Sequence, residues 1–172
     1  MRTHSLLTAA FALGLIATSS AQVTAGLAVR VAFAEGHGTL TNREGQTAEF
    51  AFRVRKPDHE HAQGSFKFAT FDRHHGHVNI ATEHINRLVV DGNRAAFGGP
   101  AVMRVVDAAG HVREFHGELS VHVVDNAIVW HGHHRRHVDL MELTFAPTGA
   151  DWTYSFSGSA DPRSMRVGYR WE

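Results

Sequence analysis

The sequence contains no cysteine and only four prolines in 172 residues. The absence of cysteine excludes disulfide bonds, a thiol nucleophile and the lipid-modified cysteine of a lipoprotein. A chain of this length fits a single domain. Such a domain buries about 68–70% of the surface of its unfolded chain, so it needs neither disulfides nor a metal ion in order to fold.

The sequence also lacks an excess of charge of either sign. Lysine and arginine together number 17, and aspartate and glutamate together also number 17. A nucleic-acid-binding protein neutralises phosphates with clustered basic residues, so this balance argues against a nucleic-acid partner. With 43% hydrophobic and 20% charged residues, the composition is that of a folded globular chain and not of a disordered one.

Long apolar runs are absent as well. The run that comes nearest is Leu6–Ala17, whose 12 residues would extend about 18 Å as a helix. Spanning a bilayer takes about 20 residues, so we expect no transmembrane anchor. Arg2 precedes the run and small residues follow it, which is the pattern of a secretory signal peptide cleaved after Ala21.

Ala25 and Ala28 offer alternative cleavage positions, because small residues lead up to each of them. We expect residues 1–21 to be a signal peptide and residues 22–172 to be one mature β domain. The mature protein is then exported to the periplasm or the extracellular space, with no transmembrane segment after cleavage.

Motifs of catalysis are absent too. The chain has no Gly-x-Ser-x-Gly elbow and no His-Glu-x-x-His pair, so we predict that it is not an enzyme. Ser157-Gly158-Ser159 and Gly98-Gly99-Pro100 contain small residues around glycine, and each predicts a turn.

Short runs rich in valine, phenylalanine and isoleucine recur between turn-forming residues. In Ala48–Arg55, Phe50, Phe52 and Val54 alternate with polar residues, which predicts a strand with one buried face. Ile85–Gly98 predicts a hairpin around Asp91-Gly92-Asn93.

Further expected strands bring the total to about ten to twelve, with three of them between residues 84 and 107. They lie near residues 27–33, 66–68, 78–80, 101–107, 112–124, 127–130, 138–145, 152–156 and 165–171. This spacing predicts an all-β fold, a single antiparallel β-sandwich or barrel-like domain.

Glycines and aromatic residues recur in a distinctive order along residues 64–125. They are accompanied by apolar residues, and the set is Gly64, Phe66, Phe68, Ile85, Leu88, Val90, Gly92, Asn93, Ala95, Phe97 and Gly98. In this order the chain resembles the post-COAP domains, a family of small secreted bacterial β-domains, over about residues 26–125. The resemblance implies an exported β-fold of unassigned function and supplies no catalytic residue. It does not cover residues 127–172, where the sequence departs from the family pattern.

Histidine is the one chemically unusual residue type, with 15 copies gathered mostly in three clusters. Imidazole binds Zn²⁺, Cu²⁺ and Ni²⁺, and strand residues two apart point to the same face about 7 Å apart. The candidate metal ligands are His59, His61, His75, His77, His131, His133 and His137. Asp58, Asp72 and Asp139 are candidate oxygen donors or orienting groups. The alternatives are a loose surface affinity for metal ions and plainly solvated loops.

Taken together, these features predict an exported, non-catalytic β domain with a binding or structural role and an unidentified protein or surface partner. Two alternatives are a periplasmic or extracellular transition-metal-binding protein and a small-molecule carrier of the β-barrel type. Geometry separates them. Three imidazoles converging on one point favour metal, and an apolar cavity lined by phenylalanine and tryptophan favours a small ligand. Aromatic residues near the C-terminus, Trp130, Trp152, Tyr154, Tyr169 and Trp171, are expected to close the core or to form a binding face.

Overall fold

A computed structural model describes residues 28–72, 76–131 and 134–172, and the side chains of residues 129–135 lie outside the description. The predicted signal peptide also lies outside it. The strands are β1 (Arg30–Thr41), β2 (Thr47–Pro57), β3 (Gln63–Asp72), β4 (Gly76–Thr82), β5 (Arg87–Asp91), β6 (Arg94–Val106), β7 (Val112–His131), β8 (His134–Pro147), β9 (Tyr154–Ala160) and β10 (Met165–Trp171). In these ranges no helix is long and apolar enough to cross a bilayer.

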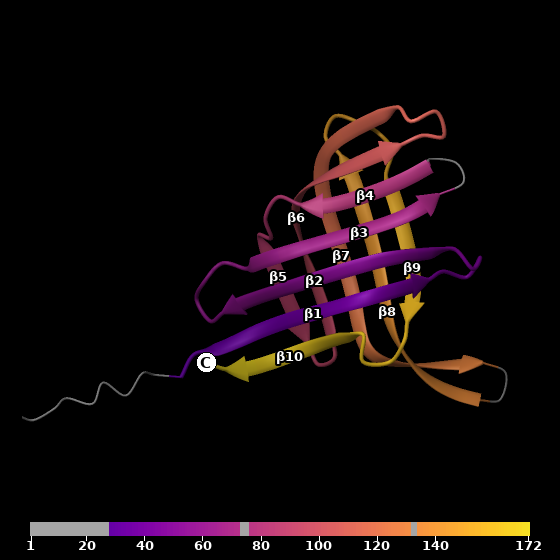
Figure 1. Cartoon of the computed structure of the whole chain (residues 1–172). Coiled ribbons are helices and arrows are strands. Elements are labelled where there is room, and N and C mark those ends of the chain that lie inside the picture. Colours follow the sequence, from indigo (N-terminus) through magenta and orange to yellow (C-terminus); the bar gives the residue numbers. More distant parts are fainter. Residues whose placement is uncertain (1–27, 73–75, 132–133) are drawn as a thin grey trace, which may run out of the picture.

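The strands form one antiparallel sheet that closes into a barrel. Its order is β10-β1-β2-β3-β4-β6-β7-β8-β9, and β9 pairs back with β1 through Ser159 and Thr41. Eight strands make the barrel, while β5 pairs with β6 and β10 pairs with β1. In Figure 1, β1 to β4 form the front layer and β7 to β9 cross behind it. The prediction of an all-β antiparallel domain is confirmed, and the segment after Asp125 belongs to the same sheet.

Because neighbouring strands are antiparallel, the connections alternate between the two ends of the barrel. The loops at residues 42–46, 107–111 and 148–153 lie at one end, which we call the mouth. The loops at residues 58–62 and 161–164 lie at the opposite end.

The core follows from side-chain alternation. Phe50, Phe52 and Val54 are buried and the residues between them are exposed, as the sequence predicts. The rings of Phe52 and Phe97 meet with centroids 5.1 Å apart. Each fully buried phenylalanine contributes about 1.5–3 kcal/mol to folding. The barrel interior is therefore occupied by side chains, and a ligand site has to lie at an end or on the outer face.

The interpretation of Gly98-Gly99-Pro100 as a turn is wrong, because these residues lie inside β6. A Cβ atom on Gly98 would lie 2.1 Å from the carbonyl oxygen of Leu119, and one on Gly99 would lie 2.5 Å from that of His84. These glycines therefore permit a close approach between backbones, and they do not reverse the chain.

Two related expectations need the same correction. Ser157-Gly158-Ser159 lies inside β9, where a Cβ on Gly158 would lie 3.0 Å from the carbonyl oxygen of Thr41 across the closing seam. Residues 84–107 hold two strands, β5 and β6, instead of three, because β6 runs on through its glycines. The hairpin predicted around Asp91 is confirmed by the pairing of Asp91 with Arg94.

Strands β7 and β8 continue past the barrel as a two-stranded arm (Figure 1). A register shift between Val124 and Ala127 marks its base, where Asn126 has a φ of 54°. An asparagine tolerates this left-handed backbone better than most residues do. The arm ends with the pairing of His131 and His134.

Two carboxylates fasten β10 to the base of the arm. Asp139 is fully buried, and its Oδ1 and Oδ2 accept hydrogen bonds from the backbone N–H groups of Asn126 (2.8 Å) and Met165 (2.7 Å). Asp125 Oδ2 accepts a third from the N–H of Val167 at 3.2 Å. Buried polar groups are stable only when paired, so these bonds fix the start of β10.

Candidate functional site

The described histidines are distributed over several parts of the barrel. His59 and His61 lie exposed in the loop between β2 and β3, whereas His77 lies in β4 beside the far end of β3. The ten residues of β3 separate these positions by about 30 Å. His59 and His61 therefore cannot share a metal ion with His77.

His137 lies exposed at the base of the arm, where its Nδ1 is 2.8 Å from the side-chain oxygen of Asn126. His75 and His133 lie outside the described residues, and so does the side chain of His131.

Within the part of the chain that the structure describes, no group of three or more His, Asp or Glu side chains is placed to hold a metal ion. Asp139, a predicted oxygen donor, is buried and uses both carboxylate oxygens on backbone N–H groups. The geometric criterion for a metal site is therefore not met by the described side chains.

The criterion for a small-ligand site is met at the mouth. A pocket of about 310 Å³ opens there, which we call the mouth pocket. Its lining residues are Val78, Met103, Val105, Arg113, Phe115, Trp152, Thr153 and Tyr154. This volume lies at the lower end of the range typical of small-molecule sites, about 300–1,000 Å³.

The floor of the mouth pocket is apolar and rigid. Val78, Met103 and Val105 are each 3% exposed or less, and they come from the neighbouring strands β4 and β6. They face the barrel interior and form the top layer of its core. A ligand seated there would cover apolar surface that the strands hold in place.

Two aromatic rings form the wall of the mouth pocket. Phe115 on β7 and Trp152 in the loop between β8 and β9 meet edge to face, with centroids 5.2 Å apart and planes at 89°. The loop is tied to β7 by a 2.8 Å hydrogen bond from the N–H of Thr148 to the carbonyl of His116. Trp152 remains 40% exposed, so an indole face is available to a ligand.

Tyr154 lies deeper in the same wall and is 8% exposed. Burial, and next the negative charge of Asp72, raise the pKa of its phenol above the ordinary value of 10.0. The hydroxyl is therefore neutral throughout the physiological range.

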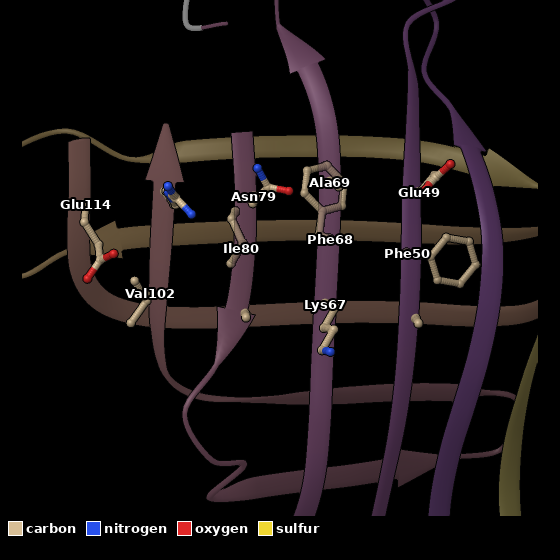
Figure 2. Close-up of a pocket in the computed structure, with 12 residues that line it drawn as sticks. Glu49, Phe50, Lys67, Phe68, Ala69, Asn79, Ile80, Val102 and Glu114 are labelled. Carbon is tan, nitrogen blue, oxygen red and sulfur yellow. The ribbon is translucent and has the colours of Figure 1, made fainter. Parts of the chain in front are cut away.

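A second hollow, the outer groove, crosses the outside of β2, β3, β4 and β6 and has a volume of about 450 Å³ (Figure 2). Its lining combines small side chains such as Ala69 with charged side chains. Figure 2 shows Glu49 and Glu114 at opposite sides of the view, with Lys67 between them. It is larger than the mouth pocket, yet it is an open sheet face, and the aromatic rings Phe50 and Phe68 beneath it belong to the buried core.

The C-terminal aromatic residues, which were expected either to close the core or to form a binding face, are found in both kinds of position. Tyr154 is buried in the core, whereas Trp152, Tyr169 and Trp171 are among the exposed large hydrophobic residues. Sequence reasoning did not single out Phe115 or Arg113. Both share the odd-numbered stripe of Leu119, which the alternation along β7 places on the inner face.

Comparison with protein-family models, curated proteins and solved structures finds no match for this chain. The resemblance to post-COAP domains stays a prediction.

Proposed function

We propose that this chain is an exported, non-catalytic binding protein whose β-barrel holds a small, largely apolar molecule in the mouth pocket. The observation that carries the proposal is the perpendicular pair of Phe115 and Trp152 above the buried floor of Val78, Met103 and Val105. Export is supported by the signal-peptide pattern of residues 1–21.

The distribution of polarity in the mouth pocket favours binding over chemistry. Among the described residues that line it, Arg113 is the one charged side chain, and the Tyr154 hydroxyl is held neutral. A general acid or base at neutral pH needs a pKa near the working pH. The lining residues that the structure describes include neither such a group nor a nucleophile beside a base.

A neutral bicyclic aromatic alcohol, 2-naphthylmethanol, tests the proposal directly. We expect calorimetry to give saturable one-to-one binding and a raised thermal midpoint, because a ligand that binds only the folded state stabilises it. Trp152→Ala is expected to weaken binding by about tenfold, through loss of apolar and aromatic contact.

Trp171→Ala is the matched control, since Trp171 is 70% exposed on β10, toward the end of the barrel away from the mouth. Equal losses of affinity in both variants, or no binding by the unmodified protein, would contradict the proposal.

The transition-metal alternative rests on side chains outside the description, those of His75, His131 and His133. Zn²⁺, Cu²⁺ and Ni²⁺ are the ions that such a histidine cluster would take.

A further inference from the structure

Arg113 stands on the inner face of the barrel wall. In β7 it lies directly opposite Val105, whose side chain is buried, and opposite residues of an antiparallel pair point to the same face. Phe115, two residues further along, lies opposite the buried Met103 and also faces inward. A cationic side chain therefore points to the side of the sheet where the other members of the stripe are apolar.

This cation has no anionic partner among the residues that the structure describes. No carboxylate lies within 4.0 Å of its guanidinium among the described residues, and the residues outside the description contain neither aspartate nor glutamate. Its neighbour Glu114 is directed to the outer groove and pairs with His116 at 3.7 Å. The guanidinium keeps its hydrogen-bond donors available at the mouth pocket.

From this placement we infer that the mouth pocket selects an aromatic monocarboxylate, whose carboxylate binds Arg113 and whose ring lies against Trp152 over the apolar floor. The inference rests on the proposed function and names its ligand class. A planar guanidinium matches a carboxylate through two parallel N–H···O bonds, which an alcohol of the same shape cannot form.

The geometry favours a single negative charge over several. Arg113 is the one cation among the described residues that line the pocket. A second anionic group on the ligand would find no second cation among these described lining residues. The apolar floor and the rings of Phe115 and Trp152 favour a ligand that is apolar apart from its carboxylate.

Three probes of the same shape test the charge requirement: 2-naphthoate, 2-naphthylmethanol and 2-naphthylmethylammonium. We expect calorimetry of the unmodified protein at low salt to show the carboxylate binding about tenfold tighter than the alcohol, since hydrogen bonds to charged groups are stronger than neutral ones. The ammonium compound is expected to bind more weakly than the alcohol. The preference for the carboxylate should shrink with added salt because Arg113 is exposed.

Arg113→Gln removes the charge, and Arg104→Gln is its matched control on the outer face of β6. We expect Arg113→Gln to bind 2-naphthoate and 2-naphthylmethanol with equal affinity. Arg113→Lys should retain part of the preference, because it keeps the charge and loses the planar fork. Arg104→Gln should retain all of it.

The outcomes separate the two proposals. Binding of 2-naphthylmethanol that depends on Trp152, without a preference for the carboxylate or with a preference that survives Arg113→Gln, overturns the inference and leaves the proposed function standing. If Arg104→Gln loses the preference for the carboxylate, the anion binds in the outer groove, and the inference is overturned. Failure of all three probes to bind overturns both.

Discussion

Asp139 Oδ2 accepts a 2.7 Å hydrogen bond from the backbone N–H of Met165, which joins β8 to the first residue of β10. The other oxygen of Asp139 accepts from Asn126 at the bulge of β7. One buried side chain therefore ties together three strands that enclose the end of the barrel opposite the mouth.

Asp139→Asn should destabilise the protein by about 1–3 kcal/mol, because one oxygen becomes an NH₂ group that faces an N–H donor and leaves it unsatisfied. Urea denaturation measures the loss. Asp91→Asn at the exposed turn before β6 is the control, and it is expected to change stability by less than about 0.5 kcal/mol. Equal effects in the two variants would refute the role assigned to Asp139.

Asp125→Asn should have the opposite sign at neutral pH. Burial, and then the negative charge of Asp139, raise the pKa of the Asp125 carboxyl above its ordinary value of 3.8 despite the hydrogen bond from Val167. A raised pKa means that the folded state favours the protonated form, so this group's contribution to stability is present below about pH 3.8 and is lost as pH rises through the folded pKa.

The amide removes that cost while keeping an oxygen for the N–H of Val167. We expect Asp125→Asn to be more stable than the unmodified protein at pH 7, with the difference shrinking toward pH 3. Urea midpoints across this range decide the matter, and a difference that does not change with pH would contradict the assignment.

Tyr154 predicts a sensitivity to alkali. The pKa of its phenol is raised in the folded state, so the stability it contributes is complete below its unfolded value of about 10 and is lost as pH rises above that. Tyr154→Phe should therefore lose less stability between pH 9 and pH 11 than the unmodified protein, because pH 10 is where an unfolded tyrosine ionises. Urea midpoints measured across this range compare the two proteins, and an equal loss of stability in both would contradict the assignment.

Gly98→Ala tests the close approach inside β6. The added Cβ would meet the carbonyl oxygen of Leu119 at 2.1 Å, so we expect a loss of about 2–3 kcal/mol from forced backbone movement. Gly168→Ala is the control, since its Cβ would meet only the Phe33 ring at an ordinary 3.6 Å. Thermal or urea unfolding compares them, and similar midpoints would show that β6 adapts freely.

A titration with Zn²⁺, Cu²⁺ and Ni²⁺ at about pH 7.5, where imidazole is mostly neutral, tests the histidine clusters. A specific site is expected to give stoichiometric binding and a raised thermal midpoint that His131→Ala with His133→Ala abolishes. Weak heat at many sites without stabilisation would favour solvated histidines.

The strand faces could be predicted from the sequence because alternation is a local property. The alternation of Phe50, Phe52 and Val54 with polar residues predicts the buried face of β2, even when its partner strands are unknown. The hairpin at Asp91 is equally local, since two turn residues fix its register.

The glycines in β6 and the mouth pocket depend on contacts between distant parts of the chain. Gly98 resembles a turn glycine until Leu119 is placed against it. The contact between Phe115 and Trp152 exists only after the loop from β8 closes over β7. Arg113 and Leu119 are both odd-numbered residues of β7, so both face the inside of the barrel. The sequence alone gives no sign that Arg113 borders a pocket.

The carboxylates at the start of β10 also bear on self-association. A strand at the edge of a sheet exposes backbone N–H groups to which another chain can add a strand. Here the N–H groups of Met165 and Val167 are already occupied by Asp139 and Asp125. These two side chains block the exposed edge of β10, so a chain in which both are replaced by alanine should become prone to aggregate.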